Sequence, residues 1–185
     1  MKRFYTFLIL LIGVITIKSQ AQATNDPNAK EILDGVSTKF KTFKTVKATF
    51  TYKVENAAGK ALSSKTGSVS MKGTKYRVNI VGQEIFSDGV NVWTYDKAAN
   101  EVTITKLDPA NVTITPQKIF TNFYDKDFLY KLNGETKLNK KTVQEIELTP
   151  IDKTKPFFKV LVYIDKNTKT IVSTKVFEKT GNKYT

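Results

Sequence analysis

The sequence predicts an α+β domain in which a large antiparallel sheet, strongly curved or half closed, is combined with two helices. Two hydrophobic periods support this prediction. Apolar residues recur every three or four positions in residues 27–40 and 115–123, as on one face of a helix. From residue 46 onward they mostly alternate in short runs separated by turn residues, as in half-buried strands. The helix–β–helix–β order therefore favours one sheet with segregated helices.

The first helix has a well-marked start. Asp26 can cap the first free N–H groups, and Pro27 fits the first helical position. One apolar stripe follows, formed by Ala29, Ile32, Leu33, Val36 and Phe40. The spacing predicts an amphipathic helix of about four turns.

The strand region starts with the clearest alternation in the chain. One face of residues 46–55 carries Val46, Ala48, Phe50, Tyr52 and Val54. Residues 62–71 are rich in Ser and Thr, which indicates either an exposed edge strand or a strand that passes a cavity. Asp88-Gly89 predicts a hairpin turn, and Trp93 and Tyr95 then share one face of the following strand.

A second helix interrupts the strands. Thr115-Pro116 repeats the pattern of a cap followed by proline. Its apolar stripe is Ile119, Phe120 and Phe123. Two amphipathic helices need a partner, and the concave side of the sheet is the surface available to them. They would either fill a plain core or cover an apolar cavity.

Residues 1–23 have the pattern of a secretory signal peptide. A basic start precedes an apolar run that ends in small residues, and this run is shorter than the about 20 residues of a membrane span. Cleavage is expected after Ala21 or Ala23, with the mature protein in the periplasm. Residues 24–185 are expected to form a single domain. Because the chain stops just after a predicted turn at residues 180–182, a truncated C-terminal strand is also expected.

The composition excludes several kinds of chemistry. The 185 residues include no His and no Cys, so a Ser-His-Asp triad, a Cys-His pair and a His-containing zinc site cannot be built. Catalysis by carboxylates alone stays chemically open, but the 17 acidic residues show no pairing that suggests it. The expectation is a protein that is not an enzyme and needs no cofactor or metal.

The chain is strongly basic, with a formal charge of +13. Residues 24–185 keep +10, because three basic residues and no acid lie before them, and Arg77 is their only arginine. Scattered lysines fit a solvated surface that protects strand edges. They also fit attraction to an acidic partner or to anionic lipid headgroups. Nucleic acid is not an expected partner, because arginine commonly reads base edges and is almost missing.

Residues 87–96 resemble a segment of the periplasmic outer-membrane lipoprotein carrier family, the LolA-like proteins. The similarity lies in a Ser-Asp-Gly hairpin followed by Trp93-x-Tyr95-Asp96. Further similar segments, in chain order, are Gly67–Lys72, Tyr76-Arg77, the helix at Thr115-Pro116 and the hairpin Asp165–Phe177. The resemblance covers residues 28–185.

This resemblance implies a half-open β-barrel lidded by helices, whose apolar cavity holds the acyl chains of lipoproteins crossing the periplasm. It also implies a monomer that is loaded by an inner-membrane ABC transporter and delivers to an outer-membrane acceptor. The family carries Lys-Arg-Pro where this chain has Lys72-Gly73-Thr74. The arginine that helps to hold the family's lid closed is therefore absent at that position.

Aromatic and aliphatic side chains suit a pocket for variable acyl chains, because they cover area without requiring one ligand shape. On the sheet, the residues expected to bind acyl chains are Phe50, Tyr52, Tyr76, Val78, Ile80, Trp93 and Tyr95. On the helices they are Ile32, Leu33, Val36, Ile119, Phe120 and Phe123. Two other functions stay open: a lipid- or lipoprotein-sensing domain without transport, and a secreted structural domain with a solid core.

Overall fold

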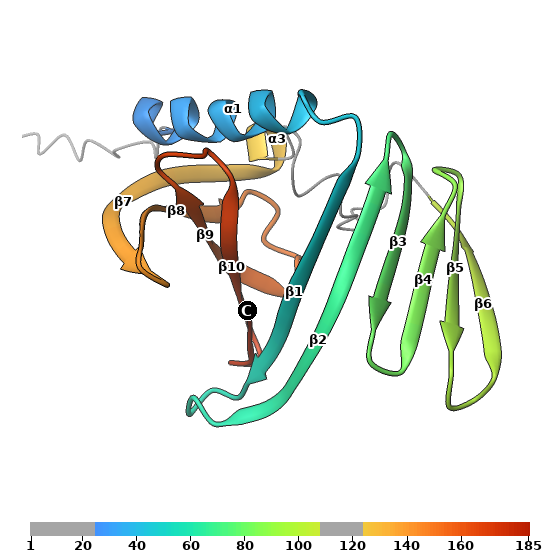
Figure 1. Cartoon of the computed structure of the whole chain (residues 1–185). Helices are drawn as coiled ribbons and strands as arrows, with labels where there is room; N and C mark the ends of the chain where they lie inside the picture. The colour runs from blue at the N-terminus through green and yellow to red at the C-terminus, as the bar shows by residue number, and fades with distance from the viewer. Residues whose placement is uncertain (1–24, 108–123) are drawn as a thin grey trace, which may run out of the picture.

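The computed structural model describes residues 25–107 and 124–185, which form one 11-stranded sheet with helices on one side (Figure 1). Neighbouring strands are antiparallel, and the spatial order is β6-β5-β4-β3-β2-β1-β11-β10-β9-β8-β7. The elements in chain order are α1 (Pro27–Lys41), β1 (Val46–Glu55), β2 (Ala61–Lys72), β3 (Lys75–Ile80), β4 (Gln83–Ser87), β5 (Asn91–Asp96), β6 (Glu101–Lys106), α3 (Tyr124–Asp127), β7 (Phe128–Leu138), β8 (Lys141–Pro150), β9 (Phe157–Asp165), β10 (Ile171–Glu178) and β11 (Lys183–Tyr184).

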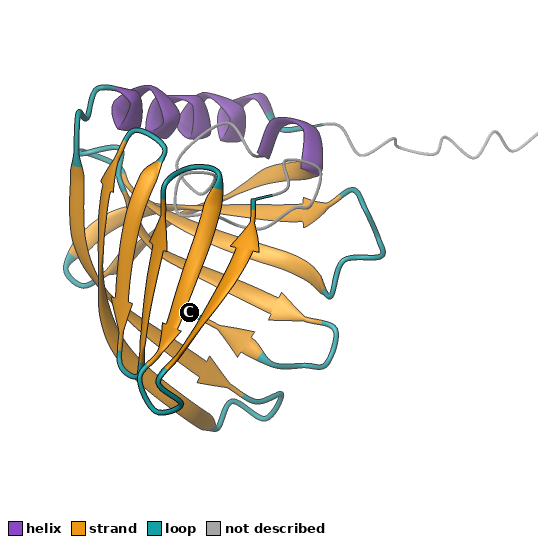
Figure 2. Ribbon diagram, turned by 90° about the vertical axis from the view of Figure 1, so that its right-hand side faces the viewer, coloured by secondary structure: helices purple, strands orange, loops and turns teal. Residues whose placement is uncertain are grey.

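The sheet is strongly curved and open, as the view in Figure 2 shows, and α1 lies across one end of it. This arrangement confirms the predicted α+β class. The predicted helix over residues 115–123 lies outside the described residues. Among the described helices, none combines the length and the apolar character needed to span a membrane.

Helix α1 begins where the sequence predicts. The side chain of Asp26 accepts a hydrogen bond from the Asn28 N–H at 2.9 Å, and Pro27 is the first helical residue. The other carboxylate oxygen of Asp26 accepts from the Leu132 N–H on β7 at 3.0 Å. The side-chain oxygen of Asn25 accepts from the Tyr130 N–H at the same distance. The start of α1 therefore covers polar backbone groups on the end strand β7, which would otherwise be an open edge.

The closed hydrophobic core lies between α1, α3 and strands β7–β10. Its buried residues are Ala29, Leu33, Val36, Tyr124, Phe128, Tyr130, Ile146, Leu148, Val160, Val162 and Ile164. The Tyr124 hydroxyl donates to the Asp34 carboxylate on α1 at 2.6 Å. This contact fixes α1 to the C-terminal half of the sheet.

The short strand β11 joins the two halves of the sheet. Tyr184 pairs with Val54 of β1 on one side and with Val176 of β10 on the other. The rings of Tyr184 and Tyr52 stack with their centroids 6.1 Å apart. Val176 packs against the core, so this register places the apolar face of β1 on the same side of the sheet as the core. That side is called the inner face below.

Strand β2 is an interior strand between β1 and β3. The small side chains of residues 62–71 left two interpretations open, an exposed edge strand or a strand that passes a cavity. The first interpretation is wrong, because β2 has a neighbour on each side. The other alternative, a strand that passes a cavity, agrees with its position on the curved sheet.

Candidate functional site

The candidate site is the inner face of β1–β4. Phe50 pairs with Gly67 of β2, which pairs with Ile80 of β3. In the next row, Val69 pairs with Val78, and Val78 pairs with Ile85 of β4. Paired residues in a sheet share one face, so the apolar side chains of four strands form a continuous surface.

This surface is only partly closed. The side chains of Phe50, Val69, Val78, Ile80 and Ile85 are all half-buried. The core under α1 is different, because its members are almost fully buried. Among the described residues, one sheet thus carries a filled core on its C-terminal half and a half-buried apolar face on its N-terminal half.

Gly67 lets the ring of Phe50 lie across β2. A Cβ atom at Gly67 would be 2.6 Å from Cζ of Phe50 and 2.5 Å from the backbone oxygen of Asn79. Both distances are shorter than real contacts allow, so only glycine fits here. The absence of a side chain at Gly67 leaves room for the tip of the Phe50 ring over β2.

Met71 and Tyr76 end this apolar surface. Both are buried, at 5% and 8% exposure, although neither belongs to the core cluster under α1. Burial raises the pKa of the Tyr76 phenol, and a hydrogen bond with Ser87 acts in the opposite direction. The hydroxyl therefore stays neutral and offers a hydrogen-bonding group beside an apolar surface.

The structure brings together five of the predicted sheet residues. Phe50, Tyr52, Tyr76, Val78 and Ile80 all lie on the inner face. Sequence reasoning missed Val69, Met71 and Ile85, which share this face. The period of two in Gly67-Ser68-Val69-Ser70-Met71 was a signal that could have found Val69 and Met71, because the serines alternate with them on the opposite face.

Trp93 and Tyr95 lie on the opposite, outer face. Trp93 pairs with Phe86, and Phe86 pairs with Arg77, whereas the inner-face residue Val78 connects through Ile85 to Thr94. The structure therefore does not bring these two rings together with Phe50 and Tyr76, and their contact with acyl chains stays a prediction. Alternation showed that Trp93 and Tyr95 share a face, but the register of β4 and β5 decides which face it is.

The α1 residues belong to the closed core. Leu33 and Val36 are 4% and 6% exposed within the core cluster, and the partly buried Ile32 packs against it. These side chains pack in the core with residues of the C-terminal strands. Their predicted contact with acyl chains would require them to leave this core. Ile119, Phe120 and Phe123 lie outside the described residues.

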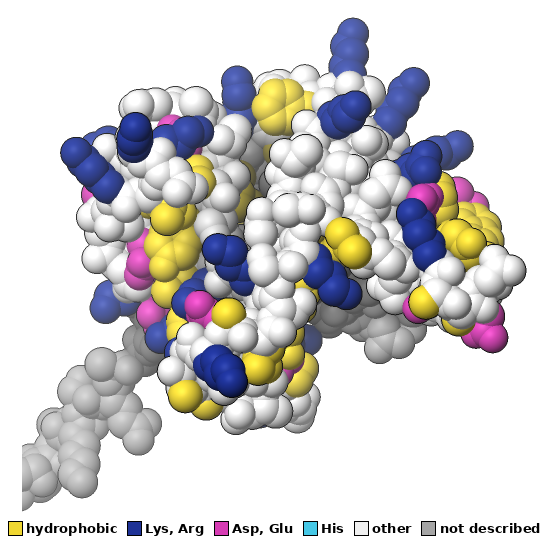
Figure 3. All heavy atoms as spheres, turned by 60° about the horizontal axis from the view of Figure 1, so that its bottom comes forward, with side chains coloured by type: hydrophobic (Ala, Val, Ile, Leu, Met, Phe, Trp, Pro, Cys, Tyr) yellow, Lys and Arg dark blue, Asp and Glu magenta, His cyan; other side chains and the backbone are white. Residues whose placement is uncertain are grey.

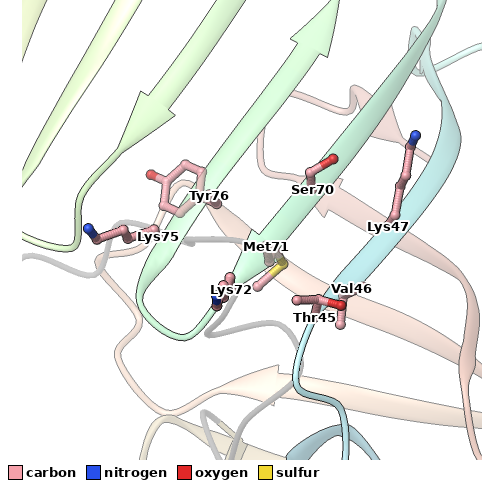
Figure 4. Close-up of a pocket in the computed structure, with 8 residues that line it drawn as sticks. All are labelled: Thr45, Val46, Lys47, Ser70, Met71, Lys72, Lys75 and Tyr76. Atoms are coloured by element: carbon pink, nitrogen blue, oxygen red, sulfur yellow. The ribbon is translucent and has the colours of Figure 1, made fainter.

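A groove of about 450 Å³ lies where β1 begins and β2 turns into β3 (Figure 4). Its lining residues are Thr45, Val46, Lys47, Ser70, Met71, Lys72, Lys75 and Tyr76. Figure 4 shows the amino groups of Lys47, Lys72 and Lys75 directed away from one another. These cations do not converge on a single point.

The acidic residues of the described chain do not form a metal centre. Across residues 25–107 and 124–185, no three acidic, His or Cys side chains gather closely enough to hold a metal ion. The described side chains of the site offer a ligand apolar contact area, and hydrogen-bonding groups lie at the margin of this area.

A partly covered apolar face on an open, curved sheet is the architecture of a binding protein. Residues 41–185 match the family model described as outer membrane lipoprotein carrier protein LolA, so the chain belongs to the LolA family. Members of this family are binding or carrier proteins for lipids or lipoproteins, and they act in the periplasm or elsewhere outside the cytoplasm.

Solved structures agree with this fold. An uncharacterized conserved protein from Thermus thermophilus is 15% identical, with a TM-score of 0.55 over 85% of this chain and 83% of that chain. The Mycobacterium tuberculosis lipoprotein LppX is 12% identical, with a TM-score of 0.52 over 86% of this chain and 93% of that chain. At these identities the likeness concerns the fold alone. No curated protein sequence matches the chain at a significant level.

Proposed function

We propose that this protein is a periplasmic carrier that holds the acyl chains of lipoproteins against the inner face of β1–β4 and moves them from the inner to the outer membrane. The observation that carries the proposal is the half-buried apolar surface around Phe50, Val69 and Val78, which lies beside the filled core. Membership of the LolA family supports lipoproteins as the cargo.

The incomplete cover of this surface suits reversible binding. Each methylene moved from water to an apolar site contributes about 0.8 kcal/mol. A fully enclosed acyl chain would therefore be released very slowly. A surface that leaves part of the chain exposed gives back some of this free energy, so that loaded and empty states differ by only a few kcal/mol.

Chemistry at the site is restricted to binding and orientation. Half-buried aliphatic and aromatic side chains supply contact area, and the Tyr76 hydroxyl supplies a polar group at one end. A polar group at the end of an apolar surface suits a ligand whose acyl chains join a polar head. This arrangement fits the acylated N-terminus of a lipoprotein.

The direct test is native mass spectrometry of the secreted protein mixed with a purified triacylated lipoprotein, followed by empty outer-membrane vesicles. A one-to-one complex that passes its cargo to the vesicles is the expected result. A complex that never discharges would replace the carrier by a sensing domain. If the folded protein forms no complex, it shares the fold of the carriers but does not bind lipoproteins.

A further inference from the structure

The outer face of the sheet carries an apolar patch far from the closed core. One row across β4, β5 and β6 consists of Phe86, Trp93 and Ile104, and the adjoining row contains Tyr95 and Val102. Ile104 is 65% exposed and Val102 is 56% exposed. Figure 3 shows hydrophobic side chains gathered at the side of the molecule where β4–β6 lie. These five residues are called the outer patch below.

The same face carries an excess of positive charge. By strand register, the basic residues on the outer face of β1–β6 are Lys47, Lys53, Lys72, Lys75, Arg77 and Lys106. The acidic residues of these strands on that face are Glu55 and Glu84. The uncompensated charge is therefore positive, which favours an anionic partner.

Both acidic residues are already engaged. Glu84 is 2.8 Å from Arg77 and 2.9 Å from Lys97. Glu55 is 3.1 Å from Lys175. At the β4–β5 turn, Lys75 also acts on the Asp88 carboxylate, whose pKa is lowered mainly by backbone N–H groups of Asn91 and Val90. Among the described residues, Lys47, Lys53 and Lys72 on the outer face form no ion pair with an acidic side chain.

The spread of the lysines distinguishes between kinds of anionic partner. The amino groups around the groove diverge (Figure 4), whereas one bound phosphate would require them to converge. Separate cations beside a patch of half-buried aromatic and exposed aliphatic side chains match a plane of many separate anionic headgroups. Trp and Tyr favour the boundary between headgroups and acyl chains, and basic residues are attracted to anionic leaflets.

We propose that the outer face of β1–β6 docks on a membrane surface rich in anionic phospholipid, with the outer patch at the headgroup boundary. This docking leaves the inner face unobstructed, so a carrier could approach a membrane while its cargo site stays open. The inference does not depend on acyl-chain binding, because the two faces use different side chains.

The chain provides its own probe, because Trp93 is its single tryptophan. Protein in its secreted form is mixed with vesicles of equimolar phosphatidylglycerol and phosphatidylcholine, or of phosphatidylcholine alone. Vesicle-bound protein is measured by sedimentation, and tryptophan emission is measured in the same samples. We expect binding to the anionic vesicles with a blue-shifted emission, and weaker binding in high salt because salt screens surface charge.

Two variants locate the binding face. Ile104→Ser and the double variant Lys72→Gln/Lys75→Gln should each lower the partition coefficient, the latter by about thirtyfold. The matched controls are Ile151→Ser, at a residue 50% exposed outside the sheet face, and Lys137→Gln/Lys140→Gln on the β7–β8 hairpin. Both controls should bind as the unaltered protein does.

Three results would overturn the inference: no binding to anionic vesicles, binding without a change in Trp93 emission, or equal losses in variants and controls. Val78→Glu separates this inference from the proposed function. That variant should lose lipoprotein binding on the inner face and keep vesicle binding on the outer face. Loss of both in a folded protein would show that vesicles bind through the acyl site instead.

Discussion

The ring of Phe50 on β1 lies directly over Gly67 on β2, where a Cβ atom would approach Cζ of the ring to 2.6 Å. This relationship sets the shape of the inner face, because it lays an aromatic ring over the neighbouring strand. The small residue on β2 thus leaves room for the aromatic ring of β1.

Gly67→Ala should destabilise the protein by about 1–3 kcal/mol, since the added methyl overlaps both Phe50 and the backbone oxygen of Asn79. Urea unfolding measures the change. The matched control is Gly35→Ala in α1, where the nearest atom is the flexible Lys169 side chain at 3.4 Å. There the same substitution should stabilise by about 0.5–1 kcal/mol. Equal effects at both positions would contradict the close approach at Gly67.

Val78→Glu should abolish lipoprotein binding while the sheet stays folded. The carboxylate would enter an apolar, half-buried surface on which an acyl chain replaces water, and an unpaired buried charge is strongly unfavourable. Val81→Glu is the control, because Val81 lies in the β3–β4 turn and is 64% exposed. Binding is measured by native mass spectrometry, and circular dichroism confirms folding. Unchanged binding by folded Val78→Glu would move the site away from the inner face of β3.

Leu33→Ala should destabilise the fold by about 2–4 kcal/mol, because it opens a cavity in the core under α1. The affinity of the remaining folded protein for lipoprotein should not change, since Leu33 contacts the core of the C-terminal half. Thermal unfolding and a binding titration below the midpoint measure the two effects separately. A weaker affinity of the folded variant for lipoprotein would show that α1 contributes to the binding site.

Asp165 should make stability depend on pH in the acid range. Backbone N–H groups of Thr168 and Asn167 and the Lys141 amine hold the pKa of its carboxylate at about 2, below the ordinary value of 3.8. Because the folded pKa is depressed, this stabilisation is present above pH 3.8 and is lost as the pH falls toward 2.

Asp165→Asn provides the comparison for that pH dependence. The free energy of unfolding of the variant should fall less steeply between pH 4 and pH 2 than that of the unaltered protein. Denaturant unfolding at several pH values measures both slopes. Parallel curves would show that Asp165 does not supply the acid sensitivity.

Local patterns in the sequence were sufficient for several elements. Asp26 and Pro27 predicted the start of α1, and the alternation around Phe50 predicted β1 and its apolar face. These predictions succeeded because capping and the periods of helices and strands depend on residues close together in the chain. The same patterns predicted a strand over residues 62–71, but they could not decide whether β2 lies at the edge of the sheet or in its interior.

The sequence by itself determined the fold class and the family, and it excluded catalytic and metal sites that need His or Cys. It also showed that Trp93 and Tyr95 share one face of their strand. Only the tertiary structure decided that this face is the outer one, and that α1 closes the C-terminal half of the sheet and leaves the surface around Phe50 partly exposed. The reason is physical. A strand presents two equivalent faces, and a choice between them arises only when neighbouring strands fix the register and a helix covers one side.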